Sequence, residues 1–243
     1  MEKKQLHNMI DIHAHILPGV DDGARSVEEA CELVKASMAA GVTAMIATPH
    51  YSRRRGTEGY EEVFQELKDT LKREYPEFQI YLGHETYYHE GLHERLKEGN
   101  AFTLAGSRYV LVEFDNGVSY QTINRAIRHL ITSGYLPILA HMERYHCLRE
   151  KKYLDNLLSS GCYLQMNYES LEGHWFQSEV RRCRNLVKEG TIDFLGTDLH
   201  RVDYRPPEIG KAMEWLEKHV DADVIRRITY ENAQCVIQNK IIS

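Results

Sequence analysis

Cysteine is scarce in this chain of 243 residues, and its distribution excludes two kinds of site. The five cysteines are scattered without CxxC spacing, so we expect reduced thiols in a cytoplasmic protein rather than disulfides or a thiolate metal site. None of the five is followed six positions later by an arginine. This excludes the loop in which one cysteine attacks a phosphoryl group that one arginine binds.

Long apolar runs and long runs of one charge are missing as well. No stretch approaches ~18 apolar residues, and no apolar segment follows the polar start Met1–Gln5, so we expect neither a membrane span nor a signal peptide. The net charge is −6 and the longest basic run is Arg53–Arg55, which argues against a nucleic-acid partner and against a nuclease. The 42% hydrophobic and 27% charged residues fit a globular protein, and we expect one domain over residues 1–243.

What the chain does contain is a regular alternation of short apolar runs and amphipathic helical patterns. Seven strands are expected, at residues 9–15, 42–48, 78–82, 109–114, 137–141, 163–167 and 193–198. Helices are expected between them; the Ser26–Glu29 capping box, for example, opens a helix that Gly41 ends. Strands joined by helices pair in parallel. The predicted architecture is therefore an α/β fold, a single-domain distorted (β/α)7 barrel with an insertion at residues 84–103.

Histidines and carboxylates recur where these apolar runs end. In a barrel of parallel strands, all the carboxyl ends lie on one rim, and that rim carries the chemistry. We therefore expect these side chains to meet there, although Asp22 could instead belong to an ordinary turn and Glu113 could be a buried acid. The candidate metal ligands are His13, His15, Asp22, His50, Glu85, Glu113, His141, Asp198 and His200.

Strand alternation supports the grouping of these side chains. In the first strand it places His13 and His15 on the inner face and turns Ile12 toward the outer helices. In the fifth strand it places Leu139 and His141 together on the inner face. Polar side chains on the rim should therefore point inward as a group.

The mixture of imidazoles and carboxylates favours Mn²⁺, Zn²⁺ or Fe over metals that prefer thiolates. Nine candidates are too many for one ion of four to six ligands, so we expect two or three ions per chain. Asp11 lies one step deeper than His13, and we expect it to accept a hydrogen bond from a ligand imidazole rather than to bind metal itself.

Several motifs in order resemble the polymerase and histidinol phosphatase (PHP) superfamily. Within it, the chain is most similar to the manganese-dependent bacterial protein-tyrosine phosphatases of capsule and exopolysaccharide biosynthesis. The resemblance runs from about Met9 to the C-terminus and rests on Asp11-Ile12-His13-Ala14-His15, Asp21-Asp22-Gly23, Thr48-Pro49-His50, Gly83-His84-Glu85, His141-Met142-Glu143-Arg144, Asp198-Leu199-His200 and Arg205-Pro206-Pro207.

This resemblance implies a PHP-type barrel with a trinuclear site, most often of Mn²⁺, that hydrolyses phosphotyrosine by metal-activated hydroxide attack. The implied partner is a tyrosine autokinase that controls capsular or exopolysaccharide synthesis. Arg144 and Arg205 match the phosphate-binding positions. The ligand sets implied for the three ions are His13, His15, Glu85 and Asp198; Glu85, Glu113 and His141; and Asp22, His50 and His200.

Three other interpretations remain open from the residues. A histidinol-phosphate-type or other small-molecule phosphoesterase of the superfamily would use the same ligands. An amidohydrolase often has a carbamylated lysine at a strand end, and the inward positions include no lysine. A metal-bound interaction module would need the ligands but no catalysis. The Arg53–Arg55 run could attract acidic phosphopeptides or be an ordinary solvated loop, and Tyr51 and Tyr87–Tyr88 could wall the pocket or only pack.

Overall fold

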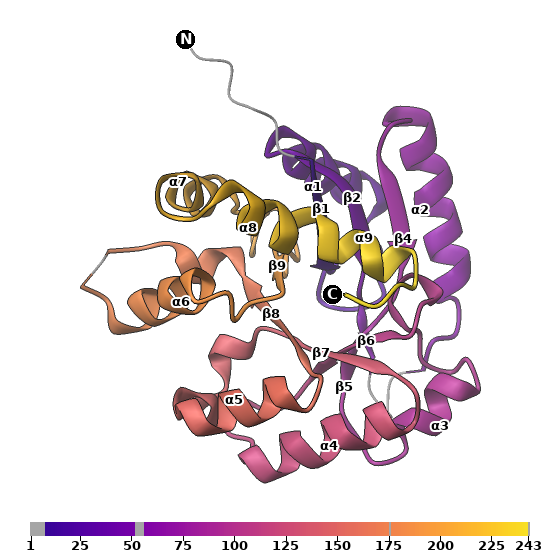
Figure 1. Ribbon diagram of the computed structural model, residues 1–243. Helices are drawn as coiled ribbons and strands as arrows, with labels where there is room; N and C mark the ends of the chain where they lie inside the picture. The colour runs from indigo at the N-terminus through magenta and orange to yellow at the C-terminus, as the bar shows by residue number, and fades with distance from the viewer. Residues whose placement is uncertain (1–7, 52–55, 175, 243) are drawn as a thin grey trace.

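In the computed structural model, which describes residues 8–51, 56–174 and 176–242, parallel strands form two hydrogen-bonded arrays (Figure 1). Every pairing between neighbouring strands is parallel. The first array has the order β1 (Met9–Ala14), β2 (Val42–Ala47), β4 (Gln79–Leu82); the second has the order β3 (His50–Tyr51), β5 (Glu85–Tyr87), β6 (Tyr109–Glu113), β7 (Leu136–Leu139), β8 (Tyr163–Asn167), β9 (Phe194–Gly196).

The last strand returns to the first, so the sheet curls into a distorted barrel. The Asp198 backbone N–H donates to the His13 carbonyl at 2.9 Å, and the His15 N–H donates to the Leu199 carbonyl at 2.8 Å. The predicted second and third strands are each interrupted: β3 and β5 are short strands that pair with each other beyond the ends of β2 and β4. The predicted α/β barrel is confirmed, with two of its predicted strands broken into shorter ones.

The helices form where the amphipathic patterns predict them. Ser26 accepts a hydrogen bond from the Glu29 N–H at the start of the first helix, and Gly41 follows its end with a φ of 104°. Among the described helices, none is long and apolar enough to cross a membrane. The helices are α1 (Val27–Ala39), α2 (Tyr60–Glu74), α3 (Leu92–Lys97), α4 (Tyr120–Thr132), α5 (Lys151–Ser159), α6 (Ser178–Lys188), α7 (Gly210–His219), α8 (Ala222–Arg226) and α9 (Asn232–Ile237).

Two apolar layers separate the inside of the barrel from its outer shell. In the outer layer, strand residues such as Val110 pack with helix residues such as Ile127 of α4. In the inner layer, Leu111 and Ile138 pack with Ala233 of α9, which also contacts β1. The C-terminal helix therefore covers the barrel interior, while the larger helices cover its outside (Figure 1).

The simple alternation predicted for two strands is wrong. Ile12 packs in the inner layer with the β6 and β7 residues rather than facing the outer helices, and Leu139 packs in the outer layer. His13 nevertheless turns inward because the pairing of β1 with β2 shifts register between Asp11 and Ala14. His141 turns inward because its backbone is left-handed, with a φ of 31°.

Candidate metal centre

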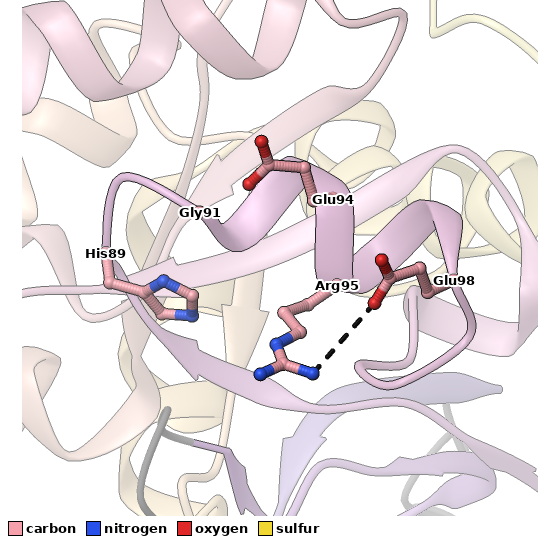
Figure 2. Close-up of a pocket in the computed structure, with 5 residues that line it drawn as sticks. All are labelled: His89, Gly91, Glu94, Arg95 and Glu98. Carbon is pink, nitrogen blue, oxygen red and sulfur yellow. Dashed lines mark ion pairs between the residues drawn. The ribbon is translucent and has the colours of Figure 1, made fainter.

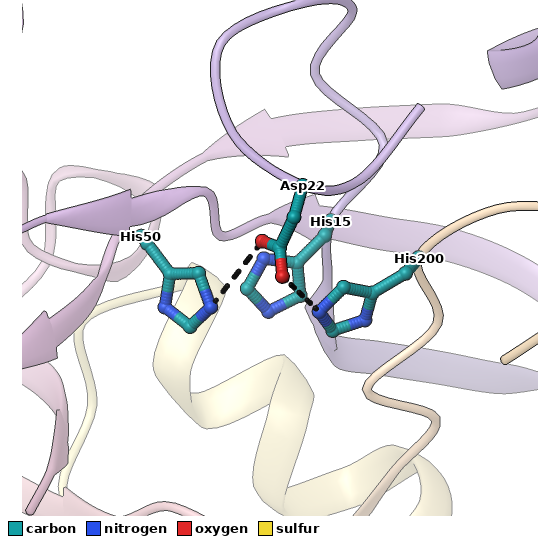
Figure 3. Close-up of side chains that lie close together, drawn as sticks. All are labelled: His15, Asp22, His50 and His200. Carbon is teal, nitrogen blue, oxygen red and sulfur yellow. Dashed lines mark ion pairs between the residues drawn. The ribbon is translucent and has the colours of Figure 1, made fainter. Parts of the chain in front are cut away.

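The candidate ligands predicted from the sequence meet at the carboxyl ends of the strands. Ligand atoms within 4.8 Å of one another occur in three overlapping groups: His15, Asp22, His50 and His200; His13, His15 and Asp198; and His50, Glu85 and Glu113. The ninth candidate, His141, joins through Glu85, whose Oε1 lies 2.7 Å from His141 Nε2. Figure 3 shows the first group, in which Asp22 points between His50 and His200 at 3.6 and 3.7 Å.

Glu85 lies at the centre of this arrangement and is almost completely buried. Its Oε1 lies 3.3 Å from His13 Nε2, and its Oε2 lies 3.2 Å from His15 Nε2 and 3.0 Å from His50 Nδ1. Despite these short distances, Oε2 accepts no hydrogen bond of acceptable geometry. A carboxylate surrounded on both oxygens by imidazole nitrogens has the position of a bridging ligand.

Three imidazoles are held by one ring nitrogen so that the other faces the cluster. His200 Nδ1 donates to the Asp198 carbonyl at 2.8 Å, because a carbonyl can only accept. His15 Nδ1 contacts Asp21 Oδ2 at 2.8 Å, and His13 Nδ1 contacts Gln165 Oε1 at 3.0 Å. In each of these three rings, Nε2 is the nitrogen that remains available to bind a metal ion.

The carboxylates of the cluster favour positive charge on His15 and His50. Burial lowers the pKa of His15, but its contacts with the carboxylates of Asp21 and Glu85 outweigh it and raise that pKa to about 10. Burial likewise lowers the pKa of His50, and Glu113 and Glu85 together raise it to about 11. The converging carboxylates therefore favour a cation in this pocket.

The donor chemistry fits divalent metal ions. The converging atoms are imidazole nitrogens and carboxylate oxygens, and no cysteine belongs to any of the three groups among the described residues. His13 Nε2 and His15 Nε2 lie only 3.4 Å apart, which is close for two lone pairs unless a cation or a proton lies between them. This set suits Mn²⁺, Zn²⁺ or Fe.

The sequence reasoning missed Asp21, the neighbour of Asp22. Its Oδ2 accepts from the His50 N–H at 2.9 Å and contacts His15 Nδ1, and its Oδ1 accepts from the Gly23 N–H at 2.9 Å. Burial raises the pKa of Asp21, but the hydrogen bond with His15 and the other donors hold it well below its usual range. The pair of adjacent acids was the signal that could have revealed Asp21. One carboxylate of such a pair can accept hydrogen bonds within the turn while the other serves as the candidate ligand.

The role predicted for Asp11 is wrong. Its carboxylate accepts from the backbone N–H groups of His13 and Thr197, both at 3.1 Å, and from the Thr197 hydroxyl. It therefore ties β1 to the end of β9, and the imidazole of His13 is held by Gln165 instead. Alternation suggested an inward Asp11, but its side chain folds back onto its own backbone.

Both predicted phosphate-binding arginines lie beside the cluster. Arg144 donates to Asp198 Oδ2 at 2.7 Å and Arg205 donates to the same oxygen at 3.2 Å. Both arginine side chains remain partly exposed, at 25% and 34%. Arg144 also borders a cavity of about 350 Å³ that opens beside the centre.

The insertion predicted at residues 84–103 carries a pocket of its own, shown in Figure 2. Its volume is about 480 Å³, and Arg95 and Glu98 form a 3.9 Å ion pair on its wall. None of its lining residues belongs to a converging ligand group. His84 is buried between the rings of Tyr51 and Phe102 and also lies outside those groups. The Arg53–Arg55 run lies outside the described residues.

Comparison with known proteins gives consistent matches over the whole fold. A family model described as capsular polysaccharide synthesis, CpsB/CapC, matches residues 9–238. The chain is 31% identical to the tyrosine-protein phosphatase CpsB of Streptococcus agalactiae serotype V, over 96% of this chain and 100% of that protein.

Solved structures agree with these sequence matches. A crystal structure from a study of YwqE from Bacillus subtilis and CpsB from Streptococcus pneumoniae, described as unique metal-dependent tyrosine phosphatases, has a TM-score of 0.87 at 28% identity, covering 97% of this chain and 96% of the other. An amidohydrolase from Mycoplasma synoviae, with a TM-score of 0.63 at 12% identity over 94% of this chain and 87% of its own, shares the fold alone.

Proposed function

Because the chain belongs to the CpsB/CapC family of capsular polysaccharide synthesis, we propose that its cluster of imidazoles and carboxylates is the active site of a metal-dependent protein-tyrosine phosphatase. The observation that carries this proposal is the convergence of the nine candidate ligands beside two arginines. The enzyme is a phosphoric monoester hydrolase. The family match favours this function over a histidinol-phosphate-type phosphoesterase.

We propose three ligand sets, the first two of which share Glu85, with Mn²⁺ as the preferred ion and Zn²⁺ or Fe as alternatives. The central position of Glu85 supports its role as a bridge between the first two sets, since its two oxygens face different histidines. The sets are His13, His15, Glu85 and Asp198; Glu85, Glu113 and His141; and Asp22, His50 and His200.

Divalent ions bound in these sets would lower the pKa of a water molecule toward neutrality and neutralise the phosphoryl oxygens during in-line attack. Arg144 and Arg205 would bind the phosphoryl group through planar, paired N–H donors. Their shared contact with Asp198 Oδ2 holds both guanidinium groups at one side of the cluster before substrate arrives. A phenolate leaving group, with a pKa of ~10, needs little help from a general acid.

Cys147 and Cys183 are poor candidates for a covalent mechanism. Burial raises the pKa of the Cys183 thiol to about 12, and Cys147 has its pKa raised by burial as well. A thiolate is the reactive form, so these thiols are poor nucleophiles at neutral pH. Hydrolysis without a covalent enzyme intermediate is therefore the mechanism we propose.

We propose a bacterial tyrosine autokinase of capsular or exopolysaccharide synthesis as the phosphotyrosine substrate, and the cytoplasm as the location. The family description and the names of the relatives support the pathway. The acidic net charge of −6 argues against nucleic acid as a partner.

The test is a phosphatase assay on a phosphotyrosine peptide after chelation and after adding back Mn²⁺, Zn²⁺ or Fe²⁺. We expect activity to disappear with the metal and to return best with Mn²⁺, and the His13→Ala variant to lose at least about 100-fold. His219→Ala on the exposed face of α7 is the matched control and should keep full activity. Activity that survives complete metal removal would contradict the proposal. Turnover of phosphoserine or histidinol phosphate equal to that of phosphotyrosine would contradict it as well.

A further inference from the structure

Strand β8 contributes none of the nine candidate ligands, yet two amide side chains from it lie in the centre. Gln165 and Asn167 alternate with Leu164 and Met166, which pack in the outer layer. Both amides are completely buried, at 0% exposure. Burying an amide is unfavourable unless its polar atoms are hydrogen-bonded, so their partners are informative.

Those partners form a continuous chain of hydrogen bonds. The His141 backbone N–H donates to Gln165 Oε1 at 2.8 Å, and Gln165 Nε2 donates to Asn167 Oδ1 at 2.8 Å. Asn167 Nδ2 in turn donates to Asp198 Oδ2 at 3.0 Å. His13 Nδ1 lies 3.0 Å from the same Gln165 oxygen. Three candidate ligands from three strands are thus joined through β8.

The direction of this chain is determined at both ends. A backbone N–H can only donate and an ionised carboxylate can only accept, so each amide can have only one orientation. Since Gln165 then presents an oxygen to His13, the imidazole must carry its proton on Nδ1. The lone pair of His13 is therefore on Nε2, which faces Glu85 at 3.3 Å and Asp198 at 3.6 Å.

The same chain selects one oxygen of Asp198. Oδ2 receives hydrogen bonds from Asn167, Arg144 and Arg205, at 3.0, 2.7 and 3.2 Å. Oδ1 lies instead 3.6 Å from His13 Nε2 and 3.5 Å from His15 Nε2. One oxygen is saturated by donors while the other remains directed into the cluster.

We propose that Gln165 and Asn167 are positioning residues that set the tautomer of His13 and the orientation of Asp198 for metal binding. This inference rests on the proposed function, because it concerns the same centre. Partners of this kind affect metal affinity by roughly 10–100-fold. If the two amides only filled space, apolar side chains of the same volume could replace them without a change in metal binding.

The test compares variants that keep the volume but change the polarity. Gln165→Met removes both the acceptor and the donor, whereas Gln165→Glu keeps an acceptor for His13 and His141, loses the donor to Asn167 and adds a negative charge. We expect Gln165→Met and Asn167→Leu to weaken Mn²⁺ binding by roughly 10–100-fold, measured by competition with a fluorescent chelator, and Gln165→Glu to recover part of that loss. Gln121→Met, on the exposed face of α4, is the matched control.

Mn²⁺ binding equal to wild type in both Gln165→Met and Asn167→Leu would overturn the inference, and so would a Gln165→Glu variant no better than Gln165→Met. A wild-type protein that binds none of Mn²⁺, Zn²⁺ and Fe²⁺ would instead overturn the proposed function, so the two failures are distinguishable. If the variants do not fold, nitrogen-15 NMR of the wild-type imidazoles decides. A proton on His13 Nδ1 in the Zn²⁺-loaded protein supports the inference, and a proton on Nε2 contradicts it.

Discussion

At the scale of single residues, the centre depends on backbone conformations that most residues avoid. His141 and Asp198 have φ angles of 31° and 53°. Such left-handed conformations are costly for residues with a Cβ and are found mainly where the surrounding structure holds them. Here each one directs a candidate ligand into the cluster. The left-handed backbone at these two residues therefore lowers the stability of the fold while it orients the candidate ligands.

Gly23 in the turn after Asp21 and Asp22 provides a sharp test of this local geometry. A Cβ at this position would lie 1.9 Å from the His15 carbonyl oxygen, so Gly23→Ala must displace the turn or the strand. We expect a loss of about 1–3 kcal/mol in the free energy of unfolding and weaker Mn²⁺ binding, measured by urea denaturation and chelator competition. Gly117→Ala, which meets nothing within 4 Å, should change neither.

Arg144 provides a second test at this scale, of phosphate recognition. Lysine keeps the charge but loses the planar fork, so Arg144→Lys should raise the KM for a phosphotyrosine peptide about 10-fold. Steady-state kinetics at saturating Mn²⁺ measure this effect. Arg226→Lys on the exposed face of α8 serves as the control. An unchanged KM and kcat in Arg144→Lys would show that this guanidinium does not contact the phosphoryl group.

At the scale of elements, the two ends of strand β9 have different roles. The carboxyl ends of β1, β7 and β9 hold candidate ligands, while β9 begins beside a half-buried acid, Asp193. The Asp193 carboxylate accepts from the Leu164 N–H at 2.8 Å, and the Asp193 backbone carbonyl accepts from Asn232 Nδ2, at the start of α9, at 2.9 Å. The acid therefore joins β8 and β9 to the C-terminal helices, far along the strand from the metal centre.

Asp193 should make the stability of the protein depend on pH. Burial raises the pKa of Asp193 to about 6, against the opposing effects of the Leu164 hydrogen bond and of Arg227. The folded state then holds this proton more tightly than the unfolded state, so its contribution to stability is lost as pH rises from about 4 to about 6. Asp193→Asn should gain roughly 1–2 kcal/mol over wild type between pH 5 and pH 7.

Urea denaturation of the metal-free proteins at both pH values measures that difference. Asp69→Asn, on the exposed face of α2, is the control for a surface carboxylate. A constant difference between Asp193→Asn and wild type across this range would contradict the assignment.

At the scale of the whole molecule, the barrel brings together carboxylates that repel each other without a cation. Segments far apart in the chain, from β1 to the loop after β9, meet at one rim, so bound metal should stabilise the closed barrel as a whole. A ligand present at 100 times its dissociation constant stabilises the folded state by about 2.7 kcal/mol. For a chain of this size, we expect removal of the metal to lower the Tm by roughly 5–10 °C.

Thermal unfolding with EDTA and with added Mn²⁺ measures this shift. The His13→Ala variant should show a smaller difference between the two conditions than wild type. An identical Tm for the wild-type protein with EDTA and with Mn²⁺ would show that the centre contributes nothing to the stability of the barrel.

The sequence alone determined which residue types stand at the predicted strand ends. Because a parallel barrel places all of these ends on one rim, it also determined that those side chains would meet. That was enough to predict the α/β barrel and to select nine side chains that do lie together. It was also enough to exclude a cysteine loop, since that mechanism requires a short local spacing that the chain does not have.

Only the tertiary structure decided which atoms of those side chains face one another. The register shift in β1 and the left-handed φ at His141 reverse the alternation that the sequence predicts. The contact between His13 and Gln165 joins residues 152 positions apart. Hydrogen-bond direction and side-chain orientation depend on such distant partners. Local sequence patterns carry no information about these distant partners. The partners nevertheless select which nitrogen or oxygen atom would bind a metal ion.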